Sequence, residues 1–145
     1  MSLWLLDASV LLASEDSDDE HHADAVRLLS CEDPLATLDL ALYEVTTVAV
    51  CAWRDLVAAG RLRARVDALA ADGGVIRADS ALLSGAAVIA DEEGISVYDA
   101  AYVAASRASG SELVSCDVRD LVSRGLARLP GDLRTGRPDP NKSSG

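Results

Sequence analysis

Leu3-Trp4-Leu5-Leu6-Asp7, near the start of the chain, is an apolar run that ends in a carboxylate. Its continuous apolar run predicts a short buried strand, because strands of a parallel sheet covered on both faces show no polar alternation. Near the other end of the chain, Leu113-Val114-Ser115-Cys116-Asp117 repeats the arrangement of an apolar run followed by a carboxylate. In open α/β sheets, ligands bind beyond the carboxyl ends of the strands. We therefore expect Asp7 and Asp117 to face one cleft.

Short apolar runs alternate with segments of helical periodicity over most of the chain. Besides the first strand, we predict strands at 35–38, 75–76, 113–115 and 127–129. Helices are predicted at about 9–13, 23–30, 40–59, 61–71, 80–92, 96–108 and 118–123. Gly60 is interpreted as the C-terminal glycine of the long helix before it. Strands separated by helical crossovers predict a parallel sheet covered by helices on both faces.

The length of 145 residues favours one domain with a single core, which we place at residues 1–133. Half of the residues are hydrophobic and none is Phe, so the core is expected to be aliphatic and rich in helices. Residues 134–145 are polar and rich in Pro and Gly, which predicts a flexible C-terminal tail.

Charge and cysteine content disfavour several classes of protein. The net charge of −11 argues against a general nucleic-acid coat protein, although it is compatible with a nuclease built on carboxylates and favours a basic partner. The three cysteines are widely spaced and form no Cys-x-x-Cys, which favours a reducing cytoplasm over a disulfide framework or a zinc site.

No apolar run reaches the ~18 residues of a membrane span, and the N-terminus lacks the basic region of a signal peptide.

Four acidic residues stand within or directly after apolar segments: Asp7, Glu44, Asp99 and Asp117. A carboxylate is costly to desolvate in such surroundings, particularly inside the apolar helices that hold Glu44 and Asp99. Taken singly, each has an ordinary explanation as a helix cap, a partner of the helix dipole or a solvated group. Together they indicate a shared divalent cation, and hard oxygen ligands without a nearby His or Cys set favour Mg²⁺ or Mn²⁺.

Four segments resemble those of a known family. In chain order they are Asp7-Ala8-Ser9, Leu42-Tyr43-Glu44-Val45-Thr46, Tyr98-Asp99-Ala100-Ala101-Tyr102-Val103-Ala104 and Leu113-Val114-Ser115-Cys116-Asp117. Over about residues 1–130 the chain is similar to the PIN-domain ribonucleases, and most similar to the VapC toxins of bacterial toxin–antitoxin pairs. The segment at 98–104 is the most specific of the four, and their combination and spacing are stronger than any one of them.

The resemblance implies a PIN-like doubly wound α/β/α sandwich with a mostly parallel sheet of four or five short strands. It also implies a Mg²⁺- or Mn²⁺-dependent endoribonuclease that hydrolyses RNA and thereby inhibits translation and growth. Its catalytic and metal-binding carboxylates would be Asp7, Glu44, Asp99 and Asp117. Ser115 takes the place of the family's frequent Thr, and Ser9 fits a small polar position near the metal. The implied partners are RNA, a VapB-like antitoxin and a second copy in a cytoplasmic homodimer, with no membrane.

Other functions stay open at this point. One is an RNA-processing nuclease of the same fold without an antitoxin, and another is a non-catalytic module whose carboxylates dock basic groups of a partner. The role of Glu44, as metal ligand or as a group that orients water, is also open. A receiver domain would need a switch-point Lys, but the only Lys is Lys142. A haloacid-dehalogenase phosphatase would need Asp where Ser9 stands, so both are disfavoured.

Overall fold

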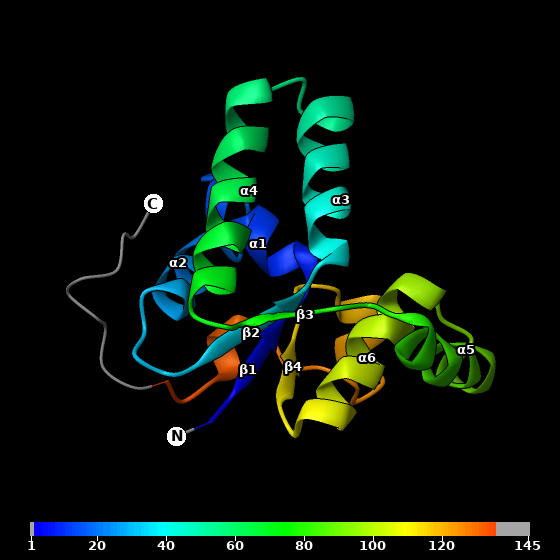
Figure 1. The fold of residues 1–145 in the computed structure, drawn as a ribbon. Helices are drawn as coiled ribbons and strands as arrows, with labels where there is room; N and C mark the ends of the chain where they lie inside the picture. The colour runs from blue at the N-terminus through cyan, green and yellow to red at the C-terminus, as the bar shows by residue number, and fades with distance from the viewer. Residues whose placement is uncertain (1, 136–145) are drawn as a thin grey trace.

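A parallel sheet lies at the centre of this computed structural model, which describes residues 2–135. β1 (Trp4–Leu6) pairs with β2 (Leu35–Leu38) on one side and β4 (Glu112–Val114) on the other, and β3 (Val75–Ile76) lies beyond β2. In the resulting order β3-β2-β1-β4, the chain first moves outward from β1 and then crosses back to add β4 (Figure 1). The carboxyl ends of β1 and β4 are therefore neighbours at the topological switch point, where sheets of this kind bind ligands.

The strand predicted at 127–129 is reduced to an isolated bridge between Arg128 and Val114. The carbonyl of Arg128 still accepts a hydrogen bond of 3.0 Å from the N–H of Ser115. The chain then turns into a short 3₁₀ helix (Pro130–Asp132), and proline has no N–H with which to continue a ladder. Within residues 2–135 the sheet thus has four strands, the lower of the two predicted numbers.

Helices cover both faces of the sheet, and each face has its own apolar core. Successive side chains of a strand point to opposite faces, so Trp4 and Leu6 of β1 enter one core and Leu5 the other. The first core is built from α1 (Ala8–Glu15), α2 (His22–Leu29), α3 (Leu40–Thr47) and α4 (Leu56–Ala71). The second is built from α5 (Ser80–Glu93) and α6 (Val97–Ser109). The expected α/β/α sandwich is confirmed.

The prediction of one helix over 40–59 that ends at Gly60 is wrong. α3 ends at Thr47 and continues as a π-helical turn (Val48–Ala52), after which Arg54 adopts a positive φ of 55°. Asp55 then starts α4 by accepting a hydrogen bond of 2.9 Å from the N–H of Ala58. Gly60 lies inside α4. Neither Gly nor Pro marks the actual break, so the continuous apolar pattern conceals it.

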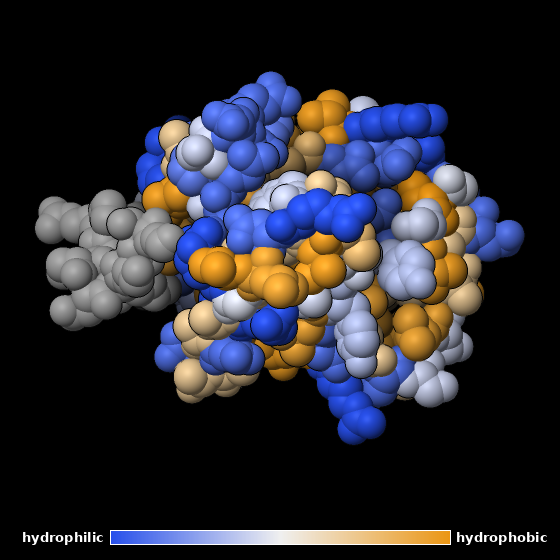
Figure 2. Space-filling model, turned by 90° about the horizontal axis from the view of Figure 1, so that it is seen from above, coloured by the Kyte–Doolittle hydropathy of each residue, from blue (hydrophilic) through white to orange (hydrophobic). Residues whose placement is uncertain are grey.

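α3 and α4 form a hairpin that projects from the sheet (Figure 1). Figure 2 looks down on that end of the molecule, where apolar side chains form separate patches among hydrophilic ones. On the hairpin, Tyr43, Leu56 and Val57 are 77%, 76% and 66% exposed. Within residues 2–135, no helix is both long and apolar enough to cross a bilayer. Most of the tail predicted at 134–145 lies outside the described residues, from 136 onward.

Candidate active site

Asp7 lies between the end of β1 and the start of α1. Its backbone N–H donates to the carbonyl of Val114 in β4 (3.2 Å), which joins the two strand ends. Its side chain caps α1 by accepting a hydrogen bond of 3.3 Å from the N–H of Val10. Asp7 is only 5% exposed, and this burial raises the pKa of its carboxyl group to about 6. At neutral pH it is therefore a buried anion, which needs compensating partners.

Two serine hydroxyls supply part of that compensation. Ser9 Oγ donates to Asp7 Oδ1 and Ser115 Oγ donates to Asp7 Oδ2, both at 2.5 Å. Each hydroxyl also accepts a backbone hydrogen bond of 2.9 Å, Ser9 from Cys116 and Ser115 from Asp117. These bonds oppose the rise in the pKa of Asp7 and tie the segment after β4 to the carboxylate. Both predicted supporting residues therefore contact Asp7.

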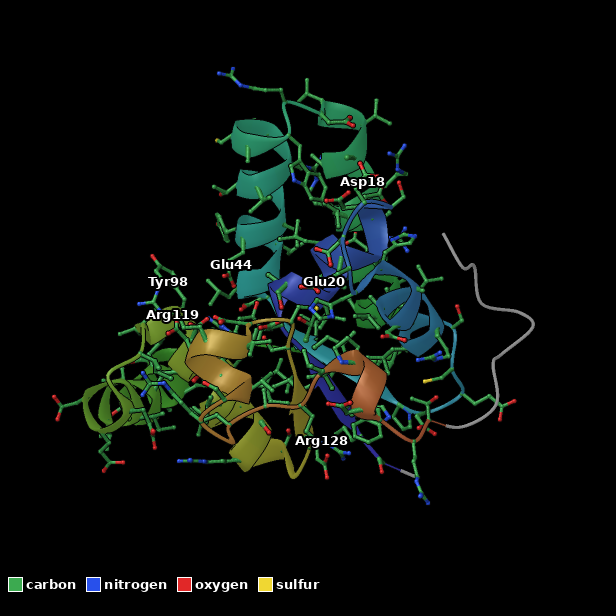
Figure 3. The ribbon with its side chains drawn as sticks, turned by 180° about the vertical axis from the view of Figure 1, so that it is seen from behind. Asp18, Glu20, Glu44, Tyr98, Arg119 and Arg128 are labelled. Carbon is green, nitrogen blue, oxygen red and sulfur yellow. The ribbon has the colours of Figure 1, made fainter. Side chains whose placement is uncertain are left out.

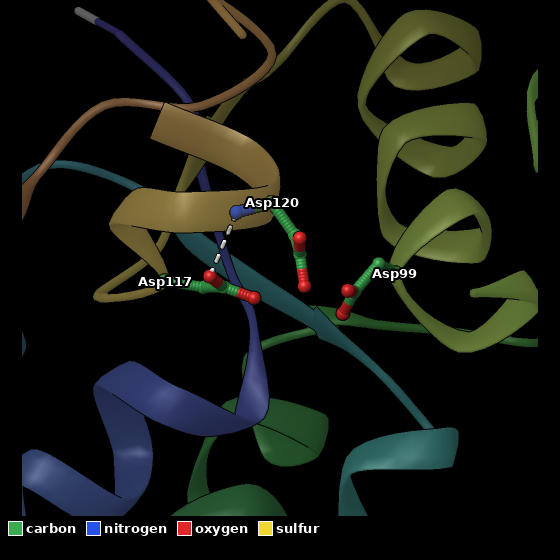
Figure 4. A group of neighbouring side chains, drawn as sticks. All are labelled: Asp99, Asp117 and Asp120. Atoms are coloured by element: carbon green, nitrogen blue, oxygen red, sulfur yellow. Dashed lines mark hydrogen bonds between the residues drawn. The ribbon is translucent and has the colours of Figure 1, made fainter. Parts of the chain in front are cut away.

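Asp99, Asp117 and Asp120 form a compact group of carboxylates (Figure 4). Each offers one oxygen, and these oxygens lie within 4.8 Å of one another. Asp99 is in the first turn of α6, which Ser96 caps. Asp117 precedes a π-helical turn (Val118–Val122) and accepts a hydrogen bond of 3.0 Å from the backbone N–H of Asp120. Helix starts from two distant segments thus bring the three side chains together.

Glu44 projects from α3 and is half-buried. Its Oε1 accepts a hydrogen bond of 2.8 Å from the hydroxyl of Tyr102 in α6. Figure 3 shows Glu44 at the end of α3 nearest to α6, with Tyr98 and Arg119 beyond it. Burial raises the pKa of Glu44, and the charge of Asp99 raises it further. The charge of Asp99 also raises the pKa of Asp7. Asp99 thus interacts electrostatically with each of the other three members of the predicted quartet.

Little positive charge offsets the three-aspartate group within residues 2–135. The guanidinium of Arg119 lies 3.9 Å from the carboxylate of Asp120, but its side chain is 94% exposed and screened by solvent. The pKa of Asp99 is raised by burial first and then by the charges of Asp117 and Asp120. Mutually repelling hard oxygen donors are the ligand set that Mg²⁺ and Mn²⁺ accept, so the side chains present fit such an ion.

Thiol chemistry is disfavoured at this site. Cys116 is adjacent to Asp117, but burial and then the charge of Asp7 raise the pKa of its thiol to about 12. The thiolate is the nucleophile and metal ligand of cysteine chemistry, and it would be scarce at neutral pH. Cys116 therefore acts as a backbone donor to Ser9 rather than as a reactive group.

Asp120 was not among the predicted site residues. A signal was present, because Asp117-x-x-Asp120 places two carboxylates about one helical turn apart directly after a strand. The pattern is equally typical of a capped surface helix, so it does not by itself predict a metal ligand. Conversely, Asp7 and Glu44 were predicted with the quartet, but neither belongs to the compact three-carboxylate group. The hydroxyl of Ser115 joins Asp7 to the backbone of Asp117, and the charge of Asp99 acts on both Asp7 and Glu44.

Residues 4–124 match the PIN domain family. No curated protein sequence matches the chain. Among solved structures, a toxin–antitoxin complex from Klebsiella pneumoniae has a TM-score of 0.65 at 16% identity, over 87% of this chain and 96% of that chain. VapC20 of Mycobacterium tuberculosis, a toxin that cleaves the sarcin–ricin loop, has a TM-score of 0.65 at 21% identity, over 87% and 98%. PAE2754 of Pyrobaculum aerophilum has a TM-score of 0.63 at 25% identity, over 90% and 85%. At such identities the similarity concerns the fold.

Proposed function

Since this chain belongs to the PIN domain family, we propose that it is a metal-dependent endoribonuclease that acts as the toxin of a toxin–antitoxin pair. One observation carries the proposal: side-chain oxygens of Asp99, Asp117 and Asp120 lie within 4.8 Å of one another, beside the buried Asp7. In the folded protein the three carboxylates lie close together. Among residues 2–135, no buried Lys or Arg offsets their charge. A divalent ion removes that repulsion and is also what hydrolysis of a phosphodiester requires.

Asp7, Asp99 and Asp117 would hold a Mg²⁺ or Mn²⁺ ion directly or through water, with Asp120 as a further oxygen donor. Such an ion, when bound, neutralises phosphate charge and lowers the pKa of a bound water. The serine hydroxyls at Asp7 keep its carboxylate in one orientation before any ligand arrives. This preorganisation avoids a reorganisation cost during the reaction.

Glu44 would orient the attacking water or share the ion. Attack of water on phosphorus, with departure of the 3′ oxygen, leaves a 5′-phosphate on one product and a 3′-hydroxyl on the other. Because the pKa of Asp7 is about 6 and those of Glu44 and Asp99 are raised, protons compete with the ion in mildly acidic solution. Cleavage is therefore expected to weaken as the pH falls through about 6.

The assignment as a toxin draws on the structural neighbours, which include a toxin–antitoxin complex and an RNA-cleaving toxin. A cytoplasmic antitoxin with basic side chains would suit the net charge of −11. Exposed apolar residues such as Leu56 and Val57 on the α3–α4 hairpin provide surface that a partner could cover. We also propose that the active protein is a homodimer.

RNA cleavage by the purified protein tests the nuclease. Protein freed of any partner is incubated with total cellular RNA and Mg²⁺ or Mn²⁺, beside Asp99→Asn and the control Asp91→Asn. Asp91 is exposed on α5, so its replacement should leave cleavage unchanged. Discrete metal-dependent fragments that disappear only with Asp99→Asn support the proposal. A folded wild-type protein that cleaves nothing with either metal contradicts it and favours a non-catalytic interaction module.

Growth experiments separate the toxin from a processing nuclease. Induced expression should arrest growth, and Asp7→Ala or Asp99→Ala should abolish the arrest without loss of the folded protein. A small neighbouring reading frame whose product restores growth would support the antitoxin. Undiminished arrest by both variants would refute the catalytic assignment, and RNA cleavage without any growth effect would favour RNA processing.

A further inference from the structure

Tyr102 is a buried phenol that meets the candidate active site from inside the protein. It is 1% exposed and among the largest fully buried side chains of the described residues. It follows Asp99 by three positions on α6, so both side chains lie on the same side of the helix. Its hydroxyl donates to Oε1 of Glu44 at 2.8 Å. The one polar atom of this side chain thus reaches out of the second core to a site carboxylate.

The hydroxyl of Tyr102 also lies close to the start of α1. The backbone N–H of Ala8 lowers the pKa of this hydroxyl, and the charge of Asp7 raises it. Burial, followed by the charge of Glu44, raises the pKa of Tyr102 far above its usual range. A tyrosine hydroxyl is protonated at neutral pH, so the phenol is the donor in its hydrogen bond with Glu44. It hydrogen-bonds to Glu44 on α3 and lies near the N-terminus of α1.

We propose that Tyr102 is a positioning residue of the nuclease: its hydroxyl holds Oε1 of Glu44 and leaves Oε2 to act in the site. This inference rests on the proposed function. A half-buried glutamate has several side-chain rotamers, and a hydrogen bond to one oxygen selects among them. The hydrogen bond takes one acceptor position of Oε1 and fixes the direction of Oε2, which suits a group that orients one water or contributes one metal bond.

The size of the expected loss in activity can be taken from other metal sites, in which a second residue hydrogen-bonds to a metal ligand and orients it. Removal of such a partner typically reduces activity or metal affinity about 10–100-fold. Tyr102 is buried and cannot touch RNA, so KM for RNA should stay constant while kcat falls. The loss should also depend entirely on Glu44, because the proposed action of Tyr102 passes through that side chain.

The test compares kcat and KM of the full-length protein on one RNA in saturating Mn²⁺. Tyr102→Phe removes a single oxygen and should fold, because water can reach the half-buried Glu44. We expect a kcat reduced about 10–100-fold with KM unchanged. The matched control is Tyr98→Phe, which removes the hydroxyl of a 61% exposed tyrosine on the same helix and should retain wild-type kcat.

A double-mutant cycle distinguishes positioning from a general structural defect. In the Glu44→Ala background, Tyr102→Phe should cause no further loss of kcat. Glu44→Asp, which withdraws the carboxylate by one methylene, should behave like Tyr102→Phe, and the two changes together should be no worse than either. Wild-type kcat in Tyr102→Phe, or an equal loss with and without Glu44, overturns the inference. Absence of cleavage by the wild-type protein itself would instead reject the proposed function.

Discussion

Replacement of Asp7 by Asn should stabilise the metal-free protein at neutral pH while it abolishes RNA cleavage. The two opposite effects have one cause, namely the buried charge of a 5% exposed carboxylate. The neutral amide avoids the desolvation of that charge. The hydroxyls of Ser9 and Ser115 can rotate to serve either an amide or a carboxylate, so the local hydrogen bonds survive.

The size of the stabilisation follows from the pKa values. Burial raises the pKa of Asp7 from 3.8 to about 6 in the folded protein, so folded molecules bind more protons there than unfolded ones. The stability contributed by the neutral carboxyl group is fully present below pH ~4 and is lost as the pH rises through about 6. At about 1.4 kcal/mol per pH unit between the two pKa values, the loss at pH 7 is about 3 kcal/mol. For a chain of this length, that is roughly 10 °C in Tm.

The assay is urea unfolding in the presence of a chelator, from pH 4 to pH 7.5, for wild type and Asp7→Asn. Other titrating groups cancel in the difference between the two free energies of unfolding, which should grow by about 3 kcal/mol in favour of Asn as the pH rises. The control is Asp79→Asn, because Asp79 also caps a helix, α5, but is exposed. Its profile should run parallel to that of the wild type.

Parallel pH profiles for wild type and Asp7→Asn would contradict this prediction, because the buried charge of Asp7 would then not destabilise the folded protein. Saturating Mg²⁺ provides a second comparison. An ion that binds only the folded state stabilises it by mass action. Mg²⁺ should therefore raise the stability of the wild type more than that of Asp7→Asn, and an equal rise would remove Asp7 from the metal site.

Three further outcomes follow from the geometry. Gly74→Ala should destabilise the fold by several kcal/mol in urea unfolding, since a Cβ there would meet the carbonyl oxygen of Leu35 at 2.3 Å. Gly60→Ala is the control: Gly60 lies in open space inside α4, so this change should stabilise the fold by about 1 kcal/mol. Glu15→Gln should cost about 3 kcal/mol by the same measurement, because the 7% exposed carboxylate bridges two arginines of α4. Asp120→Asn should weaken Mn²⁺ binding in calorimetry about 10-fold; unchanged affinity would exclude Asp120 as a ligand.

Local sequence signals predicted most of the elements. Apolar runs marked β1, β2 and β3 at their observed positions, and Gly94 and Gly110 end α5 and α6 as left-handed C-caps. The helix boundary at 53–55 was not predictable in this way. It depends on a π-helical turn and a positive φ at Arg54, which no turn-forming residue announces.

The site was predictable in its residue types but not in its arrangement. Asp7 and Asp117 follow strands, and the parallel topology places strand ends at one edge, so their proximity could be expected from the sequence. The position of Asp120 within the carboxylate group and the hydrogen bond from Tyr102 to Glu44 could not be predicted from the sequence. They depend on how the turn at 118–122 is set against α6, and that is decided by packing in the second core.

A parallel α/β sheet with carboxylates at its strand ends was predictable from the amino-acid sequence, because strand patterns, helix caps and residue chemistry are local properties. Long-range packing sets which carboxylates lie close together, which are buried and which hydroxyls hold them. The reason is physical: desolvation, charge repulsion and side-chain hydrogen bonds depend on distances between segments up to 108 residues apart, such as Asp7 and Ser115.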